Sequence, residues 1–367
     1  MKRLLIANAS SIFAKELRAE LFSKGLDTYL LDFESLRLFD DKNSEIKKYA
    51  NRFSKYENIP KISMLMRMLI IKELLREHGF DVINIHYSRW YYLIILKELA
   101  RSKLIVTFYG SDFYRVSDKI KNIQKPLYKK ADALTFTNPL TKESFLEYYG
   151  DFESKSFVCR FGLKTLDYID KNRDKDKAEI KKELGYDETK IIVTCGYNSS
   201  KAQQHKKIIE HILKLPNDML KKVQFIFPLT YGDMPYKEEV RSILKSTDLD
   251  YIILEDYLYE DNNAYIKPAS DIMINILQSD SFSGSMQEFL YAGNVVITGS
   301  WLPYGVFDKE GIKYLKIDKS DDLSDKLMQI VQNLEVYKKG LDTNRDIIYN
   351  LSSWKSNIQN WIDIYED

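Results

Sequence analysis

Cysteine is scarce in this chain, neither sign of charge dominates, and no long apolar run is present. The two cysteines, Cys159 and Cys195, are too few for a disulfide framework or a structural zinc site. Lys and Arg number 55 and Asp and Glu 54, and this net charge of +1 argues against a general nucleic-acid binder, which needs a dominant basic field. No apolar run reaches the ~18 residues that a membrane-spanning helix requires.

The N-terminal apolar run, residues 1–7, is too short for the core of a secretory signal and is better explained as a first strand. The 367 residues suffice for two domains of ordinary size, and 44% apolar residues suffice to fill their cores. These features predict a soluble intracellular protein.

Strands and helices are predicted to alternate along both halves of the chain. Residues 4–7 and 28–31 have strand patterns, and residues 12–24 between them have helical spacing. Such a βαβ opening is typical of parallel, doubly wound sheets. The charge-dense segment 170–182 is predicted to be the interdomain linker, and a strand at 191–195 then starts a second half with the same alternation.

Two segments of the first half have unusual compositions. Residues 40–56 are highly charged and are predicted to form a mobile excursion. Residues 61–75 are Met-rich and apolar, with Lys61, Arg67 and Lys72 at intervals. This second segment is either a buried helix of the domain or a helix on a membrane surface whose basic side chains reach lipid headgroups.

The second half of the chain is organised around residues 280–297. A predicted buried strand, residues 271–277, leads through a turn of small residues to a helix at 286–291. The free N–H groups at such a helix start favour an anion in the crevice beyond the strand ends. Asp280 and Glu288 flank this start with seven residues between them, and carboxylates accept hydrogen bonds from sugar hydroxyls. The segment therefore predicts a phosphate site with a polyhydroxylated group beside it.

This stretch resembles the E-x7-E region of GT-B glycosyltransferases of the large retaining family 4. Asp280 replaces the first Glu of that motif, and Phe282, Glu288 and Ala292-Gly293 stand in their expected places. The resemblance implies that Glu288 binds the nucleotide ribose. It also implies that Asp280, one methylene shorter than Glu, holds hydroxyls of the donor sugar near the reacting carbon.

A second loop, residues 109–112, resembles the HGSD-type loop of the same family, with Tyr109 in place of His. The resemblance implies that the Tyr109 hydroxyl contacts the donor sugar, although a tyrosine cannot act as a base at neutral pH. Asp112 is expected either to activate the acceptor or to brace the loop, and a helix cap is an equal alternative. The residues predicted on the acceptor side are Gly110, Ser111, His86 and Arg89, where His86 and Arg89 follow a predicted strand and also have purely structural interpretations.

In the family, the loop after the strand at 191–195 carries an Arg and a Lys that neutralise the donor diphosphate. A cation is needed there because charge on the leaving group grows as the glycosidic bond breaks. Arg is absent from this loop, so Lys206 is predicted to supply the charge, followed by Lys201, and two solvated lysines are the alternative. The other predicted donor contacts are Gly196, Asn198, Ser283, Gly284, Ser285, Tyr257 and Leu258.

The resemblance covers nearly the full length and implies the GT-B architecture. This is an α/β fold with two Rossmann-like doubly wound domains facing across a cleft, and its C-terminal helix crosses back to the first domain. The expected domains are an acceptor domain, residues 1–168 with the crossover helix at 350–367, and a nucleotide-sugar donor domain, residues 169–349. No metal or cofactor is expected, because the D-x-D motif at 248–250 precedes a predicted strand instead of ending one.

The predicted function is a metal-independent glycosyltransferase that uses a UDP-, TDP- or GDP-linked sugar. The resemblance implies transfer with retention to a saccharide or a polyprenyl-diphosphate-linked saccharide, in bacterial surface polysaccharide (capsule or O-antigen) biosynthesis. The expected location is cytoplasmic, at the inner face of the cell membrane, with no nucleic-acid partner. The alternatives are an inverting enzyme similar to the Fuc4NAc transferases, a GT-B sugar-nucleotide epimerase, and a non-catalytic partner subunit.

Overall fold

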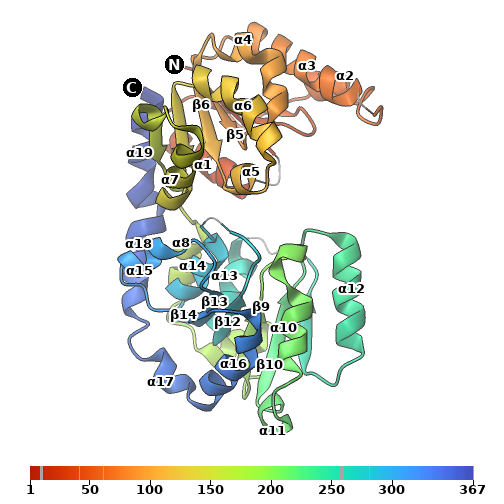
Figure 1. Ribbon diagram of the computed structural model, residues 1–367, viewed down its shortest axis with the longest axis vertical. Helices are drawn as coiled ribbons and strands as arrows, with labels where there is room; N and C mark the ends of the chain where they lie inside the picture. Colours follow the sequence, from red (N-terminus) through yellow and green to blue (C-terminus); the bar gives the residue numbers. More distant parts are fainter. Residues whose placement is uncertain (9–10, 41, 61, 257–259, 281, 367) are drawn as a thin grey trace. The chain divides into compact units, whose positions relative to one another are not determined.

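The computed structural model describes residues 1–367 except 9–10, 41, 61, 257–259, 281 and 367 (Figure 1). It divides into two compact units. Unit 1 consists of Met1–Gly162 and Trp354–Asp367, and unit 2 consists of Leu163–Ser353. Each unit contains its own sheet, mainly parallel in unit 1 and parallel in unit 2, covered by helices, as the alternation of strand and helix patterns predicts.

Among the described residues, the unit 1 sheet has eight strands in the order β4-β3-β2-β1-β5-β6-β7-β8. β1, β2 and β5 to β8 are parallel, and the short β3 and β4 extend the edge in antiparallel fashion. The strands are β1 (Arg3–Ala7), β2 (Thr28–Asp32), β3 (Leu38–Phe39), β4 (Glu45–Ile46), β5 (Val82–His86), β6 (Lys103–Phe108), β7 (Ala133–Phe136) and β8 (Ser156–Val158).

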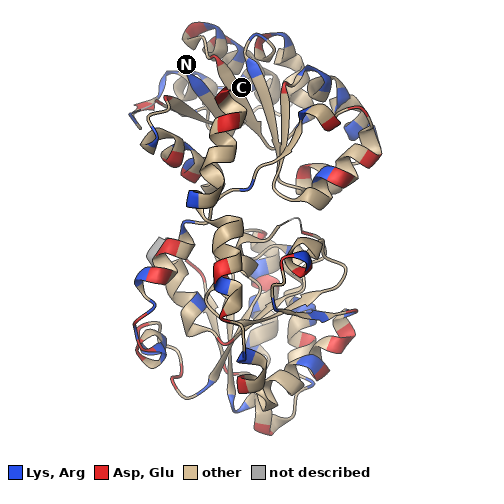
Figure 2. Ribbon diagram, turned by 90° about the vertical axis from the view of Figure 1, so that its left-hand side faces the viewer, with Lys and Arg blue, Asp and Glu red and all other residues tan. Residues whose placement is uncertain are grey.

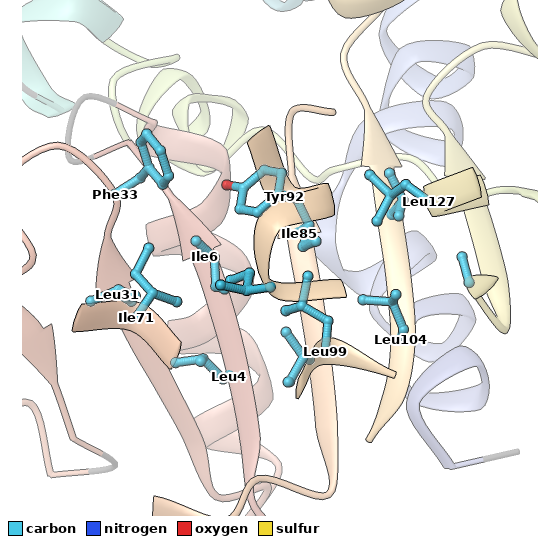
Figure 3. Close-up of a cluster of buried hydrophobic side chains, with 14 of the residues drawn as sticks. Leu4, Ile6, Leu31, Phe33, Ile71, Ile85, Tyr92, Leu99, Leu104 and Leu127 are labelled. Atoms are coloured by element: carbon cyan, nitrogen blue, oxygen red, sulfur yellow. The ribbon is translucent and has the colours of Figure 1, made fainter. Parts of the chain in front are cut away.

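Helices cover both faces of this sheet. The helical elements of unit 1 are α1 (Ile12–Ser23), α2 (Lys48–Phe53), α3 (Ile62–His78), η1 (Trp90–Ile95), α4 (Leu96–Leu99), α5 (Ser111–Tyr114), α6 (Asp118–Lys130), α7 (Pro139–Tyr149), η2 (Glu153–Lys155) and α19 (Trp354–Glu366). Alternate residues of β1 enter different clusters: Leu4 and Ile6 pack with α3, η1 and α6, whereas Leu5 packs with α1 and α19. This period of two is expected for strands buried on both faces. Figure 3 shows the first cluster, with Ile71 and Tyr92 beside the strand residues.

The C-terminal helix α19 belongs to unit 1, as the predicted crossover requires. Trp361 donates its indole N–H to the carbonyl of Arg160 at 2.8 Å. The buried Tyr365 hydroxyl accepts a hydrogen bond from the Asn84 amide at 2.7 Å. At the start of the helix, Trp354 lies so close to Gly162 that a Cβ there would come within 2.2 Å of the indole ring.

Unit 2 contains a six-stranded parallel sheet, counted over its described residues, in the order β11-β10-β9-β12-β13-β14. Numbered within the unit, this is the order 3-2-1-4-5-6 of the Rossmann fold, and the order reverses between β9 and β12. The strands are β9 (Ile191–Cys195), β10 (Val223–Pro228), β11 (Tyr251–Leu254), β12 (Ile272–Asn275), β13 (Val295–Gly299) and β14 (Leu315–Ile317).

The helical elements of unit 2 are α8 (Thr165–Lys171), α9 (Lys177–Glu183), η3 (Lys201–Gln203), α10 (His205–Ile212), α11 (Asn217–Leu220), α12 (Met234–Lys245), α13 (Glu260–Ala269), α14 (Gly284–Tyr291), α15 (Gly305–Lys309), η4 (Ser320–Asp322), α16 (Leu323–Gln332), α17 (Leu334–Lys338) and α18 (Thr343–Ser352). Apolar side chains of α10, α12 and α16 fill the main core against the sheet. Of the helices that the structure describes, none is long and apolar enough to cross a bilayer.

Two charged segments are more ordered than the sequence predicts. Residues 40–56 are expected to be a mobile excursion, but the described part contains β4 and α2, and Tyr49 and Phe53 are fully buried. Charges in this segment are paired with α3, as in the contact of Lys48 with Glu77 at 2.7 Å. Residues 170–182, expected to be a linker, contain the end of α8 and most of α9, both part of unit 2.

Candidate functional site

The predicted donor residues of unit 2 lie at the point where its strand order reverses. β9 and β12 are parallel neighbours, so the loops that follow them emerge at the same edge of the sheet. The loop after β9 begins at Gly196, and the segment after β12 carries Asp280 and leads into α14. The fold therefore brings together two segments that are about 80 residues apart in sequence.

Helix α14 starts at Gly284, two residues earlier than predicted, and Ser283 caps it. The Ser283 hydroxyl accepts a hydrogen bond from the backbone N–H of Met286 at 3.1 Å. The Gln287 side chain donates to the Ser283 carbonyl at 3.0 Å, which fixes the entry of the chain into the helix. The first-turn N–H groups, including those of Gly284 and Ser285, have no partner within the helix and suit an anion.

Asp280 is held by a tyrosine from another strand end, and a second tyrosine, Tyr197 after β9, lies close enough to feel its charge. The Tyr304 hydroxyl, located after β13, donates to Oδ2 of Asp280 at 2.5 Å and accepts from the Asn275 amide at 3.2 Å. Burial, and next the nearby Asp280 charge, raise the pKa of both Tyr304 and Tyr197, so both hydroxyls stay protonated. Sequence reasoning missed both tyrosines, and their positions just after strand ends were the available signal.

Glu288 forms a buried ion pair. Its Oε2 lies 2.9 Å from Nζ of Lys267 in α13, and the two side chains are 10% and 3% exposed. Burial lowers the pKa of Lys267, and the Glu288 charge opposes this shift. The Lys267 ammonium also contacts the Asn263 side chain and lies 5.7 Å from the centre of the Phe289 ring. Sequence reasoning missed Lys267, which stands in the mainly apolar run Ala264–Ala269.

The two lysines predicted to neutralise the diphosphate are paired with acids in unit 2. Lys201 lies 3.3 Å from Asp233, and Lys206 lies 2.5 Å from Glu239. Both pairs are well exposed, and exposed pairs contribute little to stability, so either lysine can exchange its partner for a phosphate at low cost. Asn198 turns its side chain into its own loop, where Oδ1 accepts from the Ser200 N–H at 2.9 Å.

Gly196 packs against the side chain of the buried His205. Its φ of +68° is unfavourable for other residues, and a Cβ there would come within 2.9 Å of both Gln203 Oε1 and His205 Nε2. Burial lowers the pKa of His205 to about 4, so the ring is neutral at physiological pH. Sequence reasoning also missed His205, whose ring packs against the backbone of the predicted donor loop at Gly196.

In unit 1, three strand ends converge on Tyr109. Its hydroxyl lies 3.0 Å from Nδ1 of His86, which ends β5, and 3.2 Å from the Ser11 hydroxyl, in the loop after β1. Burial raises the pKa of Tyr109 and lowers that of His86 to about 3. The three side chains therefore form a neutral hydrogen-bonded cluster. Neither Tyr109 nor His86 acts as a base in its ground state.

Asp112 is almost fully buried beside this cluster. Oδ1 accepts from the backbone N–H of Tyr109 at 3.0 Å, and Oδ2 accepts from that of Ser88 at 2.9 Å. Burial raises the pKa of Asp112 to about 6, and the backbone hydrogen bonds oppose this shift. Both oxygens are thus engaged with the loops after β5 and β6, a geometry that favours the bracing alternative over acceptor activation.

The remaining predicted acceptor residues surround this brace. Gly110 precedes α5 with φ +93°, and the Ser111 hydroxyl donates to the Tyr87 hydroxyl at 3.3 Å. The exposed Arg89 guanidinium lies 4.6 Å from the centre of the Tyr87 ring. Such stacking leaves guanidinium N–H groups available to a ligand. Tyr257 and Leu258, predicted to contact the nucleobase, lie outside the described residues.

The first 138 residues have a recognisable sequence relationship. Residues 2–138 match the profile of the family described as "Glycosyl transferase 4-like". No curated protein matches the sequence.

Solved structures of the same fold span the whole chain. Sucrose-phosphate synthase from Thermosynechococcus elongatus matches with a TM-score of 0.79 and 12% identity over 100% of this chain and 98% of its own. HepE from Anabaena, in complex with UDP and glucose, matches with a TM-score of 0.73 and 12% identity over 99% of each chain. UDP-GlcNAc 2-epimerase from Neisseria meningitidis, bound to UDP-GlcNAc, matches with a TM-score of 0.65 and 15% identity over 99% of this chain and 98% of its own. At these identities the likeness shows a shared fold, which confirms the predicted GT-B architecture.

Proposed function

We propose that this chain is a glycosyltransferase that transfers a sugar from a nucleotide diphosphate bound to unit 2, because its residues 2–138 match the glycosyl transferase 4-like profile and the whole chain shares the GT-B fold. The observation that carries this proposal is the placement of Asp280 and Glu288 on either side of the α14 start, at the reversal of strand order. Each carboxylate is oriented by a buried partner, Tyr304 or Lys267. A preorganised pair of acceptors beside an anion site suits a sugar nucleotide.

In this proposal, Glu288 binds the ribose hydroxyls and Asp280 binds hydroxyls of the donor sugar. The diphosphate lies at the start of α14, and Lys206, with Lys201 next, neutralises it after leaving Glu239. Helix-start N–H groups and a cation stabilise the leaving group as its charge grows. The HepE complex contains UDP and glucose, which makes a uridine nucleotide the first donor to test.

The proposed chemistry is transfer with retention at the anomeric carbon. The bond from that carbon to the diphosphate oxygen breaks, the acceptor oxygen forms a new bond to the same carbon, and the acceptor proton passes to the departing phosphate. This route needs no protein base, which agrees with the engagement of both Asp112 oxygens by backbone N–H groups. An inverting enzyme of the Fuc4NAc-transferase type would need such a base.

We further propose that the first predicted domain, residues 1–168 with 350–367, provides the acceptor side, and that the second, residues 169–349, provides the donor side. Arg89 and the Tyr109 cluster are the candidate acceptor contacts. The proposed acceptor is a saccharide, free or linked to a polyprenyl diphosphate, in bacterial surface polysaccharide biosynthesis. The proposed location is the cytoplasmic face of the membrane.

An epimerase remains the second candidate, because the Neisseria epimerase shares the fold. Such an enzyme would use a His near the sugar, whereas His86 is buried against Tyr109 with a pKa of about 3. Incubation with the donor alone separates the two activities. An epimerase converts the donor, and a transferase leaves its sugar unchanged apart from slow hydrolysis. A non-catalytic subunit would bind nucleotide without turnover of any donor and acceptor pair.

The test is a thermal-shift screen with nucleotide diphosphates and nucleotide sugars, since a ligand that binds the folded state raises Tm. We expect a shift with at least one nucleotide, and its loss in Glu288→Ala. Glu288→Gln, which keeps an oxygen for Lys267, serves if the alanine variant does not fold. Glu188→Ala, an exposed acid of the same unit, is the matched control and should shift as the wild type does. An equal shift in the Glu288 variants would overturn the site assignment.

A further inference from the structure

Exposed apolar side chains concentrate in unit 1 between residues 59 and 123. On α3, Ile62, Leu65 and Leu69 have 46%, 48% and 43% of their surface exposed. These three residues are three and four positions apart, so they share one stripe of the helix. The other exposed apolar residues of this region are Ile59, Trp90, Ile94, Tyr114 and Ile123.

α3, η1 and α6 cover the same face of the unit 1 sheet. Buried residues of all three elements belong to one core cluster, and Figure 3 shows Ile71 of α3, Tyr92 of η1 and Leu127 of α6 within it. α3 packs against η1, and η1 packs against α6. Their exposed side chains therefore lie on the side turned away from the sheet, a surface we call the α3–α6 face.

Three of these apolar residues, Ile62, Leu65 and Trp90, lie on the half of this face next to the candidate acceptor residues. α3 ends shortly before β5 begins, so its first turns, with Ile62 and Leu65, lie toward the opposite edge, where β5 ends. Trp90 begins η1 immediately after Arg89. The same edge carries His86 and the Tyr109 loop.

The part of the chain that contains these residues has a net positive charge. Residues 59–130 contain fourteen Lys and Arg and six Asp and Glu, a net charge of +8 in a chain whose net charge is +1. The rest of the chain is therefore net negative. In the view of Figure 2, Lys and Arg are intermixed with Asp and Glu over both units.

The basic residues that the sequence analysis assigned to lipid contact are not those that the fold exposes. The Arg67 guanidinium lies 5.0 Å and 4.6 Å from the ring centres of Phe33 and Phe53, inside unit 1. Lys72 lies 3.2 Å from the buried Glu98. Lys61 lies outside the described residues. Exposed lysines are instead found on α6, with Lys119, and on α4, with Lys97, and α4 packs against α3 and η1 at this face.

We propose that the α3–α6 face docks on an anionic lipid bilayer. Isoleucine, leucine and tryptophan side chains insert at the headgroup boundary, where tryptophan is favoured, and the surrounding lysines attract anionic headgroups. The inference deepens the proposed function and rests on it for one point: the bilayer brings a lipid-linked acceptor to the strand edge beside Arg89. The docking itself rests on the exposed residues and the charge alone.

A bilayer fits these observations better than a protein partner. The exposed apolar side chains are spread over α3, η1, α5 and α6, and α4 and α6 add exposed lysines, whereas a protein–protein interface is depleted of charge at its core. The net positive charge is spread over 72 residues, so it does not point to one acidic protein partner. A lipid surface offers both an apolar layer and a continuous negative potential.

The test is co-sedimentation of the whole protein with vesicles of phosphatidylcholine alone, or of phosphatidylcholine with phosphatidylglycerol. We expect binding to the anionic vesicles, at least tenfold stronger than to the neutral ones and weakened by 0.5 M salt. Leu65→Gln/Leu69→Gln and Lys97→Glu/Lys119→Glu should each reduce it about tenfold or more. The matched controls in unit 2, Leu213→Gln/Val336→Gln and Lys221→Glu/Lys222→Glu, should bind as the wild type does.

Every outcome of these experiments either supports the docking proposal or overturns it. Equal binding to both vesicle types, no binding, or equal losses in the face variants and their controls would overturn the proposal. Nucleotide-dependent thermal shift, measured without vesicles, should be unchanged in the face variants, which also shows that they fold. If no nucleotide shifts Tm but the vesicle results hold, the proposed function fails and the docking surface stands.

Discussion

Nζ of Lys267 lies 2.9 Å from Oε2 of Glu288, and both side chains are almost excluded from solvent. Glu288 is the acid that we assign to the ribose, so its position depends on a lysine from another helix, α13. A buried charge is tolerated when a partner of opposite sign fixes its geometry. The pair thus links the stability of unit 2 to its proposed donor site.

Removing one member of this pair should be costly. Lys267→Met leaves Glu288 buried without a counter-charge, and we expect a loss of about 3–5 kcal/mol in the free energy of unfolding. Chemical denaturation followed by circular dichroism measures the loss. In Lys267→Met/Glu288→Leu both charges are absent, so most of the stability should return. A single variant as stable as the wild type would contradict the pair's buried character.

Tyr304→Phe should impair the donor site more than the fold. The substitution removes the hydroxyl that donates to Asp280 and accepts from Asn275, so Asp280 loses its orientation. We expect a stability loss of about 1 kcal/mol and a reduction of kcat/KM for the donor of about tenfold or more. Tyr314→Phe removes a hydroxyl that lies 2.8 Å from Asp308 and 3.3 Å from the backbone carbonyl of Tyr304 but leaves the Tyr304 hydroxyl in place, and is the control. Similar kinetics in the two variants would show that Tyr304 does not act on the site.

Stability should decline in mild acid partly because of His86. Its pKa in the folded protein is about 3, below its ordinary value of about 6.5. Between these values the unfolded chain binds a proton that the folded one rejects, so stability is present above pH 6.5 and falls as the pH drops toward 3. The slope from this one group is at most about 1.4 kcal/mol per pH unit.

The measurement is the free energy of unfolding between pH 7 and pH 4, for the wild type and for His86→Phe. The variant should be less stable at pH 7, because it loses the contact with Tyr109, and it should depend less steeply on pH. His205 contributes in the same direction and is unaffected by the substitution. Parallel curves would mean that His86 does not titrate as its burial requires.

Lys206→Ala distinguishes the two interpretations of this lysine. Its pair with Glu239 is exposed, so Tm without ligand should not change. If the ammonium neutralises the diphosphate, the nucleotide-dependent shift should fall strongly while the shift with the nucleoside alone stays the same. Lys207→Ala, one position along the same helix, is the control. Unchanged nucleotide binding would show that Lys206 is a solvated lysine with no role in the site. Lys201 would then be the next residue to test.

The sequence predicts the architecture well because both units are built from short apolar strands alternating with helices. The start of α14 and the flanking pair Asp280 and Glu288 were recognisable because they are local in sequence. The partners Tyr304 and Lys267 were not, since they come from other strand ends or helices and meet these acids only through the order of the sheet.

Composition led to a wrong prediction for residues 40–56, which were expected to form a mobile excursion. The many charges concealed Tyr49 and Phe53, which are fully buried, and long-range ion pairs with α3 satisfy part of the charge. Local patterns contain no information about such pairing. The same limit applies to Asp112, whose bracing hydrogen bonds come from backbone groups of two different loops.

Helix α19 gives unit 1 a discontinuous sequence, because the 191 residues of unit 2 lie between Gly162 and Trp354. During synthesis the ribosome therefore finishes all of unit 2 before it releases the helix that buries Trp361 and Tyr365 against the first sheet. Until then, the apolar side chains against which this helix packs are uncovered on a nascent polypeptide. Chaperone binding to chains stalled before residue 354, and its decline once residue 367 has emerged, would reveal that interval.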